Sequence, residues 1–107
     1  MIITHGSNGE YGHPQHIFTH QAVRGALAES GIRAELWTRG AQFDGAERPE
    51  MLNRDDQASE LRDITPWLET KVAAAMAHRT QHAMFLRNSK APSVAAMVPH
   101  VESFKRW

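Results

Sequence analysis

Cysteine is absent from the 107 residues, which excludes disulfide bonds and thiolate metal ligands and fits a reducing cytoplasm. A net charge is absent too, because twelve basic residues balance twelve acidic ones, so no strong field attracts nucleic acid or an anionic membrane. No apolar run approaches the roughly 18 residues of a membrane span, and no basic-then-apolar signal segment opens the chain. These absences leave a small globular domain with one modest core.

Histidine, by contrast, is abundant. Four of the seven histidines, His5, His13, His16 and His20, lie in the stretch THGSNGEYGHPQHIFTH. His16 and His20 are four residues apart, which puts both on one face of a helix at a spacing that zinc ligands use. For His20, a core-flanking histidine with one satisfied ring nitrogen is the competing interpretation.

His16 is the stronger ligand candidate because it lies in the first turn of an expected helix, after a strand of a parallel sheet, where α/β proteins bind ligands. The positive end of the helix disfavours imidazolium and keeps the ring able to bind a metal. His13 precedes the helix on a glycine-rich loop and can face the same cleft as a general acid or as a clamp on an oxyanion. A plain helix cap is the alternative for His13, and nothing local fixes a role for His5.

The first third of the chain predicts a strand, a helix and a second strand. Residues 1–4, Met-Ile-Ile-Thr, predict the end of a β-strand, and residues 5–12 have the glycine content of a loop. Pro14 suits the first position of a helix that runs over 14–30 and stops at Gly31. Residues 32–37 alternate apolar and polar side chains. This βαβ pattern predicts an α/β fold with a parallel sheet.

The rest of the chain is less regular. Residues 39–62 are polar and without period, which indicates either a mobile excursion or a functional lid. Thr65-Pro66 predicts the start of a long helix over 66–85, and residues 98–107 are expected to close the chain as a short helix. On the long helix, Lys71, His78 and Gln81 would share one stripe, as a solvated face or as groups that converge on a cleft.

The segment THGSNGEYGHPQH closely resembles the second signature of the LmbE-like deacetylases, the family that includes the GlcNAc-PI de-N-acetylases (PIG-L). DITPWLETKVAAAMAHRTQ (63–81) is similar to the Lys, Ala, His and Gln helix of that family, and VESFKRW to its C-terminal end. The resemblance implies that residues 1–107 are the single C-terminal portion of a Rossmann-like domain whose N-terminal strands are absent from this chain. Residues 39–62 would be its variable loop.

The chemistry implied by the resemblance is hydrolysis of an N-acetyl amide by a metal, commonly zinc, held by two histidines and an aspartate. Three protein ligands leave one position open, and the ion lowers the pKa of water bound there. Carried over by motif, His16 is a metal ligand, His13 stabilises the oxyanion and assists the leaving amine, and Tyr11 is the active-site tyrosine. His5 and His20 are expected to be neighbours only.

Two departures from the family pattern matter. Gln15 stands where the family has an aspartate, and a neutral amide cannot favour an imidazolium electrostatically. The His-Pro-Asp-Asp signature of the family, which supplies the remaining metal ligands and the general base, has no counterpart in this chain. The isolated chain is therefore expected to bind zinc, or another divalent metal, weakly or not detectably and to be inactive.

The resemblance thus implies part of a zinc-dependent amidohydrolase that removes the N-acetyl group from an N-acetylglucosamine-type conjugate, and the composition fits a cytoplasmic protein. Its expected partner is this small molecule, with no nucleic acid and no membrane span, and an uncovered sheet edge would favour self-association. Two alternatives stay open: a non-catalytic binding or interaction module derived from the fold, and a small histidine-rich metal-binding domain.

Overall fold

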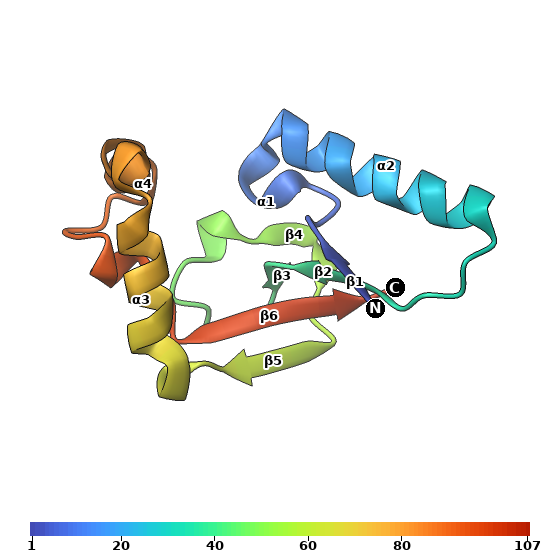
Figure 1. Cartoon of the computed structure of the whole chain (residues 1–107). Helices are drawn as coiled ribbons and strands as arrows, with labels where there is room; N and C mark the ends of the chain where they lie inside the picture. The colour runs from blue at the N-terminus through green and yellow to red at the C-terminus, as the bar shows by residue number, and fades with distance from the viewer. The chain divides into compact units, whose positions relative to one another are not determined.

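The computed structural model describes all residues, 1–107, which form two compact units. The first unit joins Met1–Arg62 to Glu102–Trp107, and the second is Asp63–Val101. The chain is α/β, as expected, with helices and strands in the order that Figure 1 shows. None of the helices combines the length and the apolarity that crossing a membrane requires.

A four-stranded sheet of order β1-β2-β6-β5 frames the first unit. Its strands are β1 (Ile2–Thr4), β2 (Leu36–Arg39), β5 (Glu60–Asp63) and β6 (Val101–Arg106). β1 and β2 are parallel, with Ile2 beside Leu36 and Thr4 beside Thr38, which confirms the predicted parallel pair. β6 is antiparallel to β2. The sheet is therefore mixed and not wholly parallel.

The closing segment is a strand, so the predicted short helix at 98–107 is wrong. β6 pairs Phe104 with Arg39 and Arg106 with Trp37, and its Ser103 is buried at 3% exposure. A short segment of mixed charged and apolar residues has no strong preference of its own. Hydrogen-bonding partners on β2 decide its conformation.

The first long helix is where the sequence predicted it. α2 (Pro14–Ser30) starts with proline at its first position, after an extended His13, and ends at Gly31 in the left-handed conformation with φ of 67°. His20 is its one buried residue, and Phe18 is 70% exposed. The sequence predicted that the next strand begins at residue 32. The strand begins at Leu36, which is also the first residue that pairs with β1.

The stretch 39–62 has regular structure, so the prediction of a mobile, structureless segment is wrong. It contains β3 (Ala41–Gln42), a 3-10 turn (Pro49–Met51), β4 (Asn53–Gln57) and most of β5, and β3 pairs in parallel with β4. Its most buried side chains include the polar Asn53 and Asp56, at 0% and 1% exposure. A search for apolar periodicity misses a segment that hydrogen bonds hold in place. The variability of its sequence stays a prediction.

The second unit is helical. A 3-10 turn (Thr65–Trp67) leads into α3 (Leu68–Ala77), and a second turn (Arg79–Gln81) into α4 (His82–Ser89). The helix predicted over 66–85 is therefore present in two pieces, broken at His78, whose φ and ψ are −79° and 54°. The His82 ring donates to the carbonyl oxygen of Met76 at 3.0 Å, which satisfies one acceptor that the break releases.

The break also changes the predicted polar stripe. Lys71 lies on α3 and is half-buried, whereas His78 and Gln81 lie beyond the end of α3 and are exposed. The three residues do not share one continuous helix face. The buried apolar side chains of this unit come from the C-terminal segment after α4: Ala91, Val94 and Val98.

Candidate functional site

The glycine-rich loop after β1 turns sharply before α2. Gly9 and Gly12 adopt positive φ values of 59° and 86°, which glycine allows at little cost. Glu10 adopts φ of 59° and ψ of −85° within the short helical segment α1 (Gly9–Gly12). This is close to the rare γ-turn with positive φ. In a residue with a side chain, such a conformation costs about 1–3 kcal/mol and persists only where surrounding contacts impose it.

Asn53, at the start of β4, supplies many of those contacts. Its Oδ1 accepts hydrogen bonds from the backbone nitrogens of Asn8 at 3.1 Å and of Glu10 at 2.8 Å. Its Nδ2 donates to the carbonyl oxygens of Arg39 at 3.1 Å and Gly40 at 3.0 Å. One fully buried amide side chain therefore joins the loop after β1 to the end of β2.

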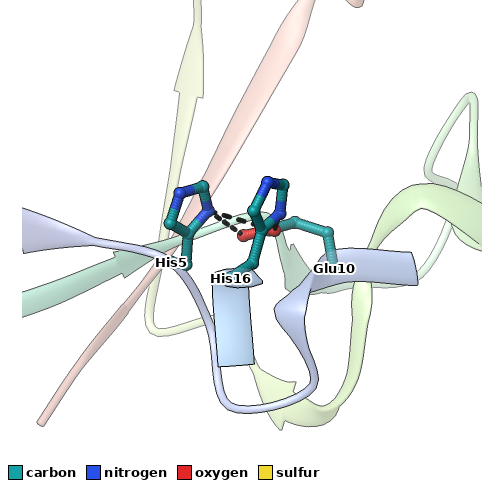
Figure 2. A group of neighbouring side chains, drawn as sticks. All are labelled: His5, Glu10 and His16. Atoms are coloured by element: carbon teal, nitrogen blue, oxygen red, sulfur yellow. Dashed lines mark hydrogen bonds and ion pairs between the residues drawn. The ribbon is translucent and has the colours of Figure 1, made fainter. Parts of the chain in front are cut away.

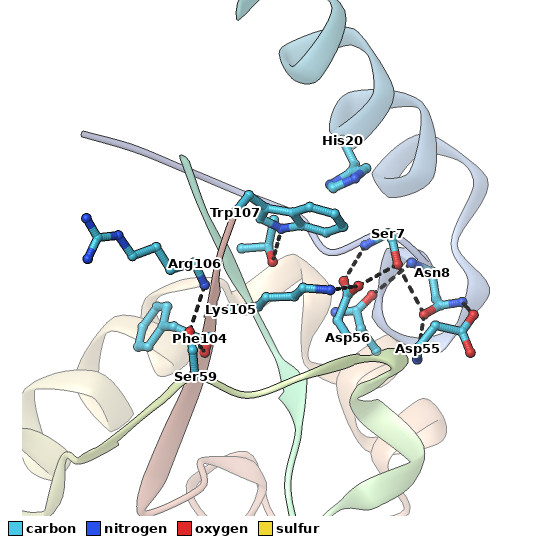
Figure 3. Close-up of polar contacts among 12 residues, drawn as sticks. Ser7, Asn8, His20, Asp55, Asp56, Ser59, Phe104, Lys105, Arg106 and Trp107 are labelled. Carbon is cyan, nitrogen blue, oxygen red and sulfur yellow. Dashed lines mark hydrogen bonds and ion pairs between the residues drawn. The ribbon is translucent and has the colours of Figure 1, made fainter. Parts of the chain in front are cut away.

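Asp56, on the same strand, holds the loop at a second point (Figure 3). Its carboxylate accepts from the Ser7 backbone nitrogen at 2.7 Å and from Ser7 Oγ at 2.8 Å, and Lys105 Nζ lies 3.4 Å from Oδ1. Gly6 must remain glycine here, since a Cβ atom would come within 2.2 Å of the Asn53 side chain. The segment from 53 to 57 thus fixes the backbone of the loop.

The loop brings His5, Glu10 and His16 together (Figure 2). The Glu10 carboxylate is nearly buried, with its Oε2 at 2.6 Å from His16 Nδ1 and 3.2 Å from His5 Nδ1. Its Oε1 accepts from the Gly6 backbone nitrogen at 3.2 Å, and Arg39 Nε lies 4.0 Å away. The His5 and His16 rings stack, with centroids 3.8 Å apart and planes inclined by 13°.

The two residues predicted to be catalytic adjoin this cluster. The His13 ring stacks on the ring of His16, with centroids 4.3 Å apart and planes inclined by 26°. Tyr11 meets both rings edge-on at 5.9 Å and is 46% exposed. His13 Nδ1 is buried without a hydrogen-bond partner. The structure therefore groups Tyr11, His13 and His16, while the roles of these residues stay predictions.

His20 lies apart from that group. It is 3% exposed, its Nδ1 donates to the carbonyl oxygen of His5 at 2.9 Å, and its ring lies 5.3 Å from that of Trp107. A buried histidine with one satisfied nitrogen is the core-flanking role that competed with a His16–His20 ligand pair. That interpretation is confirmed.

The residues present fit a divalent metal. His5, Glu10 and His16 each offer one ligand atom, and these atoms all lie within 4.8 Å of one another. Two imidazoles and a carboxylate are the donor set that zinc accepts, and three protein ligands leave one position open. His5, which the sequence predicted to be a neighbour only, is one of the three side chains that could hold a metal ion. Glu10, Asn53 and Asp56 were missed altogether. Of these three residues, only Glu10 could have been found from the sequence, because it is an acidic residue within the loop that carries the glycines and histidines.

Three known proteins that are similar to this chain carry the same name. The chain is 31% identical to the 1D-myo-inositol 2-acetamido-2-deoxy-alpha-D-glucopyranoside deacetylase of Saccharomonospora viridis, over 76% of this chain and 37% of that protein. It is 28% identical to the deacetylase of the same name from Mycobacterium sp. (strain KMS), over 97% of this chain and 41% of that protein. For the protein of Mycolicibacterium smegmatis the identity is 30%, over 76% and 36%. No protein-family model and no solved structure matches.

The relatives are deacetylases by name, and the chain spans less than half the length of each of them. The resemblance to the LmbE-like deacetylases is thereby confirmed: the chain corresponds to the C-terminal part of proteins of this family.

Proposed function

We propose that this chain forms part of the active site of a metal-dependent deacetylase that removes the N-acetyl group from an N-acetylglucosamine-type conjugate. The observation that carries the proposal is the group of Tyr11, His13 and His16 on the buried Glu10 carboxylate, in a chain related to named deacetylases of an acetamido sugar. The mixed sheet with its parallel pair is compatible with part of a Rossmann-like domain.

His16 is the metal ligand of this proposal. A divalent metal bound here would supply Lewis-acid activation of water for amide hydrolysis. The ring of His16 is held by stacking on both faces and by the Glu10 carboxylate. A ligand whose orientation is fixed in advance loses little freedom when the ion binds.

His13 is the proton donor of this proposal, and Tyr11 its neighbour in the oxyanion site. Amide hydrolysis requires that the departing nitrogen gains a proton, and an imidazole is the side chain best suited to give one near neutral pH. The orphaned His13 Nδ1 leaves one ring nitrogen without a competing protein partner. Gln15 lies exposed at the helix start and gives His13 no charge support, so we expect slower leaving-group protonation than an aspartate would allow.

A small metal-binding domain without catalysis is the second candidate. It is favoured by the His5, Glu10 and His16 group, which offers three ligand atoms within this chain alone. The two candidates differ in whether acetate is released.

The test is a chimera in which this chain replaces the matched 37% of the Saccharomonospora viridis relative. We expect release of acetate from an N-acetylglucosaminyl inositol, measured together with bound zinc. His16→Ala should abolish both readouts. His13→Ala should lower the rate of acetate release by about 10²–10⁴-fold while zinc stays bound. His20→Ala should mainly lower the stability of the fold. A folded chimera that binds zinc but releases no acetate would favour the metal-binding domain.

A further inference from the structure

We infer that Glu10 is a positioning residue that holds His5 and His16 as their Nδ1–H tautomers, so that Nε2 of His16 is the atom that binds the metal. The inference rests on the proposed function for the identity of the ligand. Its claim about the tautomers concerns the metal-free chain.

The hydrogen bonds of the carboxylate carry the first step. An ionised glutamate only accepts, so each group bonded to it must donate. Glu10 faces the Gly6 backbone nitrogen and the Nδ1 atoms of His5 and His16. Both rings then carry their proton on Nδ1. In a neutral ring the lone pair is left on Nε2, on the side away from the carboxylate (Figure 2).

The backbone of Glu10 carries the second step. The residue is 6% exposed with φ of 59° and ψ of −85°, a conformation that glycine would adopt with far less strain. The hydrogen bond from its nitrogen to Asn53 Oδ1, at 2.8 Å, helps impose this conformation. Strained residues of this kind gather at functional sites, so the strain at Glu10 supports a role for its carboxylate.

The stacked rings carry the third step. His16 lies between His5 at 3.8 Å and His13 at 4.3 Å, so its plane is set while Glu10 fixes its rotation within that plane. Histidine ligands in metal sites usually donate the N–H of their second ring nitrogen to a carboxylate, a backbone carbonyl or water. Direct binding of the metal through Nδ1 of both rings and the carboxylate is the rival arrangement, and it requires that both Nδ1 protons leave.

The first experiment determines histidine tautomers in the metal-free 107-residue chain by long-range ¹H–¹⁵N NMR at about pH 8, where an ordinary imidazole is neutral. We expect protonated Nδ1 and unprotonated Nε2 for His16 and His5, with exposed His78 as the unrestrained reference. A dominant Nε2–H form of His16 overturns the inference. This readout needs neither a variant nor a metal.

Two variants at one position separate positioning from folding. Glu10→Gly removes the carboxylate and relieves the backbone, so we expect the His16 tautomer to shift toward Nε2–H while the helical circular dichroism signal stays. Glu10→Gln keeps one acceptor oxygen and should restore Nδ1–H for one ring. Lys90→Gly is the matched control, because Lys90 also has positive φ, 54°, but lies in the second unit. Retention of the Nδ1–H tautomer in Glu10→Gly overturns the inference.

The last arm adds Zn²⁺ alone. We expect the ¹⁵N shift of His16 Nε2 to move while its Nδ1 stays protonated, and Glu10→Gly to weaken zinc binding by about 10–100-fold. Loss of the Nδ1 proton, with zinc bound at Nδ1, overturns the inference in favour of the rival arrangement. Absence of zinc binding would agree with the weak metal binding expected of this chain alone, and the tautomer result would still decide the role of Glu10.

Discussion

The two units bury different kinds of side chain. In the first unit, Leu36 and Ala41 are the buried apolar residues, and they are outnumbered by the buried polar ones: Thr4, Glu10, His20, Thr38, Asn53, Asp56 and Ser103. In the second unit the buried residues are Ala91, Val94 and Val98, with Ser89 beside them. Buried hydrogen bonds therefore hold the first unit together, whereas apolar packing stabilises the second.

This difference in buried side chains explains why the candidate site lies in the first unit. Apolar burial is non-directional and tolerates small shifts, whereas a buried hydrogen bond demands a partner at a set distance and angle. A loop held by Asn53 and Asp56 keeps its side chains in one arrangement. That is the requirement of a metal or catalytic site, and the second unit has no comparable network among its buried residues.

Asn53→Ala is expected to have the largest effect. It leaves the backbone nitrogens of Asn8 and Glu10 without their acceptor and removes the side-chain donor of the Arg39 and Gly40 carbonyl oxygens. The Gly40 oxygen keeps the backbone nitrogen of residue 53 at 2.7 Å, and we expect a cost of about 2–4 kcal/mol in unfolding free energy. In amide hydrogen exchange, protection should fall in residues 5–12 and 39–57 and remain in α3 and α4. Asn88→Ala, at an exposed asparagine of the second unit, is the control. Equal loss of protection in both units would break the comparison.

Val94→Ala is the reciprocal change. Val94 is 5% exposed, and removal of its two methyl groups should cost about 1–2 kcal/mol. Protection should fall in α3 and α4, with the amides of Glu10 and Asn53 unchanged. Met76→Ala, at a side chain that is 45% exposed, should cost less than half as much. A larger loss from Met76 would mean that the apolar contacts of the second unit lie elsewhere than its buried residues indicate.

The sequence predicted the parts of the fold that depend on local signals. Pro14 and Gly31 bound α2 because each fixes the backbone directly, and β1 and β2 form the expected parallel pair. The failures are segments whose structure depends on distant partners. β6 is a strand because β2 lies beside it, and the helix over 66–85 breaks at a histidine that carries no strong breaking signal.

The candidate site divides in the same way. Tyr11, His13 and His16 were identified because a contiguous motif carries them. Asn53 and Asp56 were invisible because they lie more than 40 positions away from the loop that they hold: the separations are 45 residues for Asn53 to Asn8 and 49 for Asp56 to Ser7. A polar residue in a charged stretch indicates exposure by default. Only its partners show that it is buried.

The smallest effect is expected where the same kind of hydrogen bond is exposed. Asp63 Oδ1 accepts from the Thr65 backbone nitrogen at 2.9 Å at the start of the second unit. The Thr65 side chain, then its backbone N–H, and then the charge of His100 lower the pKa of Asp63. Because this pKa is lower in the folded chain, the ionised carboxylate stabilises the fold above the ordinary aspartate pKa, and the contribution disappears as pH falls through the lowered value.

Asp63→Asn should therefore lower the melting temperature slightly at about pH 6, and the difference should disappear as pH falls below the ordinary aspartate pKa and through the lowered pKa of Asp63. Salt should shrink the difference, because exposed charges are screened. The measurement is the difference in melting temperature between the two proteins over this pH range. A difference as large as that of Asn53→Ala would contradict the comparison, since exposure would then not decide what a hydrogen bond contributes in this chain.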